Sequence, residues 1–183
     1  MLDLSRTWRP EPDWAEACLA GPGITILAIT SLTQRLVSGD LGRFLAQYDL
    51  GGDVGGLKVA SGERYAVRLA RDRMLVVGLA TDECADGWHA AGYAVTSIGS
   101  GQRVLEMRGE GVRDLLARAV TVDPDHAGPS AAMPFGGVTC AVYCHEGPQA
   151  LRVHVERGLA ASLWEWLECQ LLLSREASVQ ATK

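Results

Sequence analysis

The sequence predicts an α+β protein in which two small β-α-β-β-α units of the ferredoxin-like kind pack together. Strand-like and helix-like segments alternate from Gly23 onward, and the element order recurs at an offset of roughly 75 to 80 residues. A chain of 183 residues with 48% hydrophobic and 21% charged residues can bury a core without metals or disulfides. The expected division is an N-terminal arm at 1–22, units at 23–99 and 100–173, and a flexible tail at 174–183.

The first unit is expected to begin with a strand at 24–30, which is β-branched and follows a Gly-Pro-Gly break. Asp40 is the expected N-cap of a short amphipathic helix that stops at Gly51. Two strands, 65–69 and 74–79, then follow on either side of a charged turn. This order is the start of a split β-α-β arrangement.

A second helix is expected at 81–91, where Cys84, Trp88 and Ala91 recur at helical spacing. A strand at 93–98 completes the first unit. In the preceding arm, the segment 13–19 is expected to form one short helix.

The second unit repeats the order. A strand at 104–107 precedes an amphipathic helix within 109–120, and two strands at 138–145 and 151–155 precede a final helix at 159–173. The last strand alternates apolar and polar residues, so its two faces differ: Leu151, Val153 and Val155 on one, Arg152, His154 and Glu156 on the other.

The final helix is apolar around more than half of its circumference. Trp164 and Trp166 lie roughly 200° apart, so they cannot share one side of the helix, and Leu171 extends the Trp164 side. The cover comes either from the rest of this chain or from a partner subunit. Trp8 and Trp14 on the arm likewise dock either on this chain or on a partner. The candidate partner interface is therefore Trp8, Trp14, Trp164 and Leu171.

Composition excludes several classes of function. A formal net charge of −5 argues against nucleic acid as a partner, and no apolar run is long enough to span a membrane. The five cysteines are an odd number without a C-x-x-C pair, which favours a reduced, cytoplasmic protein. The first residues lack the basic start and apolar centre of a signal peptide.

No residue pattern predicts a reactive centre. Cys140, Cys144 and His145 have neither haem-attachment nor zinc spacing, which favours core cysteines. Asp123, Asp125 and His126 lie in a segment with the composition of a turn. The alternative is that the two carboxylates accept protons or hold a cation.

Two further patterns point the same way. The glycines around Gly109 lack the third glycine of a dinucleotide-binding loop, and Ser130 is not in a G-x-S-x-G motif. His89 and His154 are expected to be solvated or capped. The sequence therefore predicts no catalytic, cofactor-binding or metal-binding residue in this chain.

From about residue 101 to 171, the chain resembles the γ subunit of heterotetrameric sarcosine oxidase, a family related to part of the glycine-cleavage T protein, an aminomethyltransferase. Weaker similarity extends back to about Gly23. The resemblance rests on four blocks and their order: Arg103-Val104-Leu105; Gly109 with Leu115-Leu116-Ala117; Val122-Asp123-Pro124; and Leu163-Trp164-Glu165-Trp166-Leu167.

The resemblance implies a small subunit without its own active site, in an oxidase for sarcosine or another N-methyl amine. FAD, FMN, NAD and tetrahydrofolate are then expected on larger α and β flavoprotein subunits, and none in this chain. Two alternatives stay open: a stand-alone folate-binding protein of one-carbon transfer, for which Asp123 and Asp125 would position a folate amine, and a homodimer that buries the same tryptophans against itself.

Overall fold

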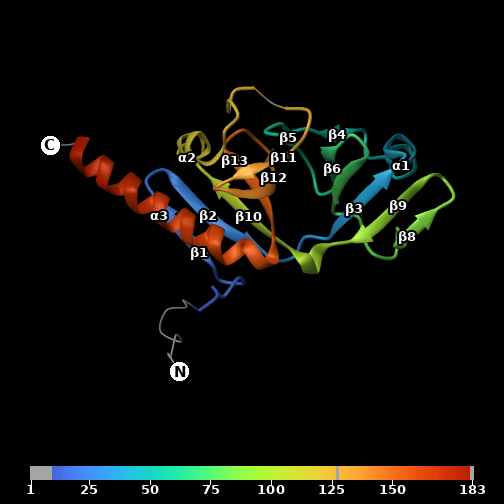
Figure 1. Ribbon diagram of the computed structural model, residues 1–183, viewed down its shortest axis with the longest axis horizontal. Coiled ribbons are helices and arrows are strands. Elements are labelled where there is room, and N and C mark those ends of the chain that lie inside the picture. The colour runs from blue at the N-terminus through green and yellow to red at the C-terminus, as the bar shows by residue number, and fades with distance from the viewer. Residues whose placement is uncertain (1–9, 127, 182–183) are drawn as a thin grey trace.

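The structure is a computed structural model that describes residues 10–126 and 128–181, with side chains described as far as 176. Two β-sheets lie side by side along the long axis of the molecule, and the helices cover them from outside (Figure 1). The expected mixed fold of strands and helices is confirmed, and strands predominate. No helix in the described residues has the length and hydropathy needed to cross a membrane.

The first sheet has the strand order β1-β2-β10-β13-β12-β11, with every neighbouring pair antiparallel. The short β5 joins β12 in parallel. Helices α2 and α3 cover one face of this sheet. The elements are β1 (Cys18–Gly21), β2 (Ile24–Ile29), β5 (Val59–Ala60), β10 (Gln102–Arg108), α2 (Val112–Ala119), β11 (Ala132–Phe135), β12 (Val138–His145), β13 (Ala150–Glu156) and α3 (Arg157–Ala181).

The second sheet has the strand order β4-β6-β7-β3-β9-β8, antiparallel except between β4 and β6. Helix α1 begins after Asp40, whose side chain accepts a hydrogen bond from the Arg43 N–H, as expected for an N-cap. The elements are β3 (Gln34–Gly39), α1 (Leu41–Gln47), β4 (Asp53–Val54), β6 (Tyr65–Ala70), β7 (Arg73–Val77), β8 (Gly87–His89), β9 (Tyr93–Ser97) and the 3₁₀ turn η1 (Gly99–Gly101).

In both sheets three strands follow the same order in space, β3-β7-β6 in one and β10-β13-β12 in the other. β2, expected to open the first unit, instead pairs with β10 in the sheet of the second. The strands therefore do not segregate between the sheets strictly in chain order.

The helix expected at 81–91 is wrong, since this segment forms turns and the edge strand β8. Gly87 has a positive φ of 115°, which interrupts a helix. Arg35 also donates to the carbonyls of Leu79 and Ala80 and to the carboxylate of Asp86, and these bonds hold the segment in a turn. Helical spacing of three apolar residues was outweighed by this long-range contact.

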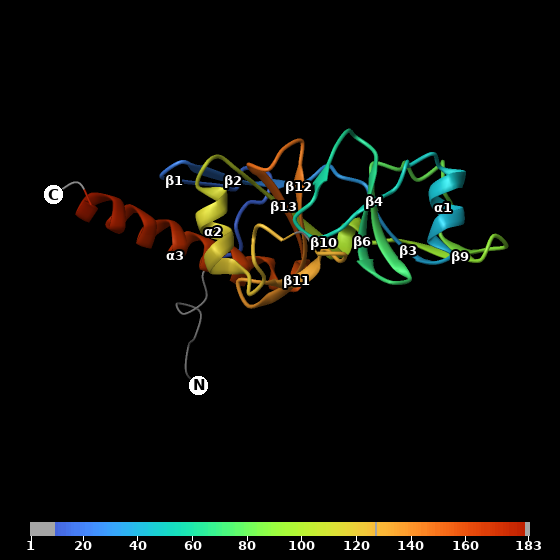
Figure 2. The ribbon, with the colours of Figure 1, turned by 90° about the horizontal axis from the view of Figure 1, so that it is seen from above.

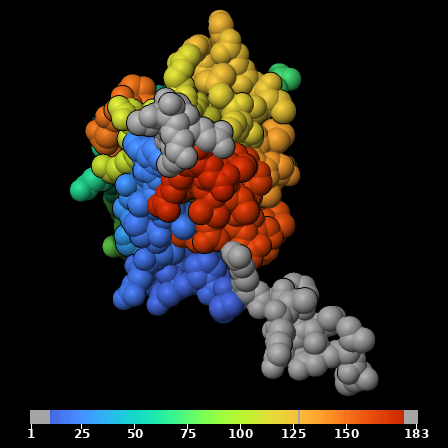
Figure 3. Space-filling model, turned by 90° about the vertical axis from the view of Figure 1, so that its left-hand side faces the viewer, coloured from blue at the N-terminus to red at the C-terminus, as the bar shows by residue number. Residues whose placement is uncertain are grey.

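The short helix expected at 13–19 is also wrong, because a turn there leads directly into β1. The Gly-Pro-Gly break then closes the β1–β2 hairpin, with Gly23 at a φ of 65°. The final helix α3 is longer than expected and reaches Ala181. Figures 1 and 2 show it extending beyond the first sheet, and Figure 3 shows it beside the N-terminal strands.

Three apolar clusters stabilise this arrangement. The largest lies between the first sheet and helices α2 and α3, and the second lies between α1 and the second sheet, around Phe44 and Tyr93. The third fills the space between the two sheets and includes Tyr65, Leu75 and Tyr143. The two sheets are thus joined by a core of their own.

Replacing Gly109 with alanine is expected to lower the free energy of unfolding by about 2 kcal/mol or more. Gly109 has a φ of 122°, and an added Cβ would lie 2.1 Å from the Gly23 carbonyl oxygen. Gly101→Ala is the matched control, because no heavy atom lies within 4 Å of the Cβ position there. Urea unfolding of both variants tests this, and equal stabilities would contradict the close approach of the two loops.

Candidate functional site

The candidate site is a set of buried polar side chains between the two sheets. In β13, the apolar residues Leu151, Val153 and Val155 pack toward α2 and α3, as expected from the alternation in the sequence. Arg152 and His154 therefore point the other way, toward the second sheet, where they are 8% and 3% exposed.

Hydrogen bonds link these residues across the interface. Arg152 Nη1 donates to the Tyr65 hydroxyl over 2.7 Å, and the hydroxyls of Tyr65 and Tyr143 are 2.8 Å apart. His154 Nε2 lies 2.7 Å from the Tyr143 hydroxyl, and His154 Nδ1 lies 2.7 Å from Gln34 Oε1. Residues from β3, β6, β12 and β13 thus form one continuous chain of hydrogen bonds.

The direction of these bonds follows from Gln34 and from the charge of His154. The Gln34 Oε1 can only accept, so His154 Nδ1 carries a proton. Because His154 is neutral, its Nε2 accepts from the Tyr143 hydroxyl, which in turn accepts from Tyr65. Burial, together with the charge of Arg152, lowers the pKa of His154 to about 3.

Glu106, 5% exposed, supplies the negative charge of the site. Its Oε2 accepts from Arg152 Nε over 2.7 Å and its Oε1 from Arg108 Nε over 2.5 Å. Burial opposes ionisation of Glu106, but the hydrogen bonds from Arg108 and Arg152 outweigh it and hold its pKa below the ordinary value. Burial also raises the pKa of Tyr143 above its ordinary value, so its hydroxyl stays protonated.

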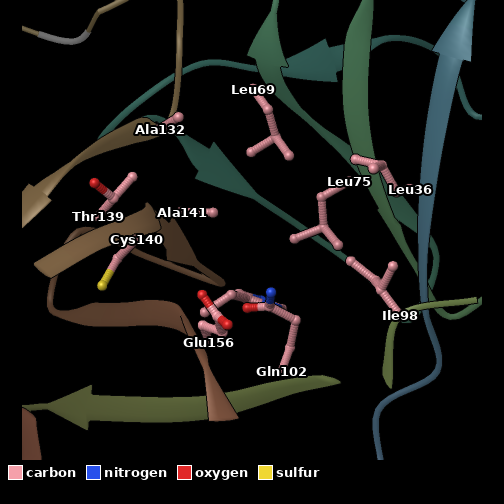
Figure 4. Close-up of a pocket in the computed structure, with 11 residues that line it drawn as sticks. Leu36, Leu69, Leu75, Ile98, Gln102, Ala132, Thr139, Cys140, Ala141 and Glu156 are labelled. Atoms are coloured by element: carbon pink, nitrogen blue, oxygen red, sulfur yellow. The ribbon is translucent and has the colours of Figure 1, made fainter. Parts of the chain in front are cut away.

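Two cavities adjoin this network. An apolar cavity of about 320 Å³ lies between the sheets, with Leu69 and Leu75 facing Ala141 across it, and His154 is part of its wall (Figure 4). A second, more polar cleft of about 470 Å³ includes Arg152 in its wall. The hydrogen-bond chain therefore runs from one cavity to the other.

His154 was expected to be solvated or capped, and that expectation is wrong, because the second sheet covers the polar face of β13. His145, at the end of β12, is also buried, and its Nε2 lies 3.1 Å from the Gly62 carbonyl oxygen. Its Nδ1 is buried and has no hydrogen-bond partner among the described residues.

The chemical shifts of the His154 ring are expected to stay constant between pH 8 and pH 5 in the folded protein. Its lowered pKa keeps the ring neutral over this range, whereas in the unfolded chain the ring titrates near pH 6.5. Stability from this group is therefore present above about pH 6.5 and is lost as the pH falls toward 3. NMR titration of ring-labelled protein, once folded and once in urea, measures the pKa of the ring in each state. A folded-state midpoint near pH 6.5 would contradict the buried neutral ring.

The other candidate clusters have structural roles. Cys140 and Cys144 are buried in the first core, as expected, and burial raises the pKa of Cys140 to about 12. Asp123 accepts the backbone N–H of Asp125 and contacts His126, which is the expected turn. Within residues 10–126 and 128–181, no cluster of His, Cys, Asp or Glu side chains has the arrangement of a metal site.

The structure brings together most of the residues expected at a partner interface. Trp14 and Trp164, 6% and 7% exposed, pack edge to face with ring centroids 5.7 Å apart. Leu171 is buried against Gly21. The arm of this chain thus supplies cover for the Trp164 side of α3. Trp8 lies outside the described residues, and the place of the other three in a subunit interface stays a prediction.

Sequence reasoning did not find the network, because its members are far apart in the chain. Gln34, Tyr65 and Tyr143 carry no motif. One signal was present in the sequence, the alternation that gives β13 a polar face. The structure shows why this face is buried: β13 is a central strand of the first sheet and the second sheet covers it.

Comparison with known proteins adds a family and a fold. A model of the sarcosine oxidase, gamma subunit family matches residues 46–171. No curated protein sequence matches the chain.

Two solved structures are similar to this one. A chain of heterotetrameric sarcosine oxidase from Corynebacterium sp. U-96, in complex with pyrrole 2-carboxylate, superposes with a TM-score of 0.66 at 13% identity, over 86% of this chain and 88% of that one. The glycine cleavage system aminomethyltransferase T from Bartonella henselae superposes with a TM-score of 0.56 at 17% identity, over 80% of this chain and 46% of that one. At these identities the likeness concerns the fold, and it agrees with the expected relationship to the T protein.

Proposed function

Because this chain belongs to the sarcosine oxidase γ-subunit family, we propose that it is the small, non-catalytic subunit of a flavin-dependent, folate-linked amine oxidase. The substrate class is sarcosine or a related N-methyl amine, which the complex demethylates oxidatively. The match over residues 46–171 is the observation that carries this proposal.

The chemistry of the buried network supports a structural role. Catalytic acids and bases need a pKa near the working pH and access to substrate. Here His154 is held neutral with a pKa of about 3, and Glu106 is held ionised between two arginines. His154 joins the two sheets through Gln34, and Glu106 holds Arg152, which bonds to Tyr65 of the second sheet. The protonation states of His154 and Glu106 do not change near neutral pH.

The proposed partners are larger α and β subunits that carry FAD, FMN, NAD and tetrahydrofolate, while this chain supports their assembly. The similar fold of a chain in a heterotetrameric enzyme is consistent with such partners. All five cysteines are free, which suits the reducing cytoplasm in which we place the complex.

We place the interface with a larger subunit at the arm and α3. A groove of about 260 Å³ lies there, between Pro10 and Pro12 of the arm and Trp164 and Glu165 of the helix. Trp14 supports this corner through its contact with Trp164. Trp8 is the further aromatic residue that we assign to this interface.

Copurification of the tagged chain from its native host tests the assignment. Two larger subunits with flavin absorbance are expected to elute with it, and tetrahydrofolate and NAD are expected to bind the complex. A lone monomer, or a homodimer by mass measurement in solution, would contradict the proposal.

A stand-alone folate-binding protein is the second candidate, favoured by the shared fold with aminomethyltransferase T. Calorimetry of the isolated chain with tetrahydrofolate decides between the two. Heat of binding at micromolar ligand supports this alternative, and no heat at high micromolar ligand contradicts it. The Asp125 carboxylate is already paired with Arg113 and Asp123 is used within its own turn, so neither is free for a folate amine.

A further inference from the structure

The polar cleft beside the network is formed by loops from both halves of the fold. Its wall includes the segment after β2, the turn before β6, the end of β7 and the end of β12. At about 470 Å³ it is large enough for a small molecule. Arg152, only 8% exposed, lies in this wall.

Arg152 has unused donors. Its Nε is bound to Glu106 and its Nη1 to Tyr65, while no hydrogen bond is made by Nη2 to any described residue. Among the described residues, the buried side-chain nitrogens without a partner are Arg103 Nε and His145 Nδ1. Arg152 Nη2 is therefore exposed, and Arg152 lies in the wall of the cleft. A guanidinium with free N–H groups at the edge of a buried site is a strong donor to an anion.

The local charge also favours an anion. Glu106 is the one carboxylate bonded to both guanidinium groups, Arg152 and Arg108. Arg108 has 60% of its side chain exposed, so water screens its charge, whereas Arg152 is largely buried and shares the carboxylate that offsets its charge. A bound anion gives the buried guanidinium of Arg152 a second negative partner.

The rim of the cleft restricts which anion fits. Glu63 and Glu146 lie in its wall, and Glu146 has 54% of its side chain exposed. Their negative charges disfavour a doubly charged anion such as phosphate, whereas a singly charged carboxylate is repelled less. His145 lies in the same wall, but its unpartnered Nδ1 is buried and is not exposed to the cleft, so Arg152 is the donor on which the site depends.

We propose that this cleft is a binding site for a small monocarboxylate, held by the free N–H groups of Arg152. The site belongs to this chain alone, so it does not depend on the identity of any larger subunit. It is also distinct from the apolar cavity on the His154 side of the network.

Titration of the ¹⁵N-labelled full chain with sodium acetate tests the site. Acetate is expected to cause saturable shifts of the Gly62 and Gly78 amides and of the Arg152 side chain, half-complete at roughly millimolar concentration. Sodium chloride at the same ionic strength and inorganic phosphate are expected to cause smaller, unsaturated shifts. Equal shifts with chloride, or no saturation with acetate, would overturn the proposal.

Three variants locate the site. Arg152→Lys keeps a cation beside Glu106 but loses the guanidinium donors, and it is expected to weaken acetate binding at least tenfold, a factor that corresponds to about 1.4 kcal/mol. Ser31→Phe at the exposed mouth of the cleft is expected to weaken it similarly without touching the core. Arg73 is an exposed arginine outside the cleft, and Arg73→Lys is expected to change the affinity for acetate by less than about twofold. Unchanged binding in both Ser31→Phe and Arg152→Lys would overturn the assignment, and Ser31→Phe keeps the test valid if Arg152→Lys fails to fold.

Discussion

Replacing Trp164 with alanine is expected to lower the free energy of unfolding of the isolated chain by about 3–5 kcal/mol. Trp164 is only 7% exposed, and its ring packs edge to face with Trp14 at an interplanar angle of 78°. Truncation removes the indole from the boundary between α3 and the arm and leaves a cavity there. The loss is a property of this chain alone and needs no partner subunit.

Trp14→Ala is expected to lower the free energy of unfolding by about 3 kcal/mol, because the same contact holds the arm against α3. Arg103 also stabilises Trp14 by a cation–π contact, since its guanidinium carbon lies 5.2 Å from the centroid of the Trp14 ring. The double variant is expected to lose less unfolding free energy than the two single variants together. The difference, about 0.5–1.5 kcal/mol, is the coupling energy of an edge-to-face aromatic pair.

Trp88→Ala is the matched control. Trp88 is 74% exposed on the edge strand β8, so its truncation is expected to change the free energy of unfolding by less than about 0.5 kcal/mol. Urea unfolding of the four variants gives all of these values. If Trp164→Ala leaves the isolated chain as stable as the wild type but prevents assembly, the packing of the arm on α3 is wrong and the tryptophans serve the subunit interface instead.

The same residues show what the sequence was able to predict. Strand alternation and helical periodicity gave β12 and β13 nearly to the residue, and they separated Trp164 from Trp166 on opposite sides of α3. These features depend on local geometry, with a period of two residues in strands and 3.6 in helices. Each is encoded by the residues that form it.

The features that the sequence did not reveal depend on contacts between distant residues. The turn at 81–91 is fixed by Arg35, more than forty positions away, and the cover of Trp164 by Trp14 joins the two ends of the described chain. The candidate site is of the same kind: Gln34 and His154 are 120 positions apart. No periodicity links such residues, so only the folded arrangement of the two sheets brings them together.

Glu106→Gln is expected to lower the free energy of unfolding at pH 7 by about 3 kcal/mol. The change keeps the size of the side chain but removes the charge that neutralises Arg152, which is largely buried. Glu16→Gln, at an exposed position, is the control and is expected to change stability by less than about 0.5 kcal/mol.

The pH dependence of this difference identifies its cause. Because the pKa of Glu106 is lowered in the folded state, its contribution to stability is fully present above the ordinary value of 4.5 and is lost as the pH falls through the lower folded-state value. His154 destabilises both proteins equally in acid, so its effect cancels from the difference. The curves of unfolding free energy for wild type and Glu106→Gln are therefore expected to run apart at neutral pH and to converge below pH 4.5. A difference that stays constant as the pH falls well below 4.5 would mean that the introduced amide disturbs the packing around Arg152 and that the charge of Glu106 contributes little to stability.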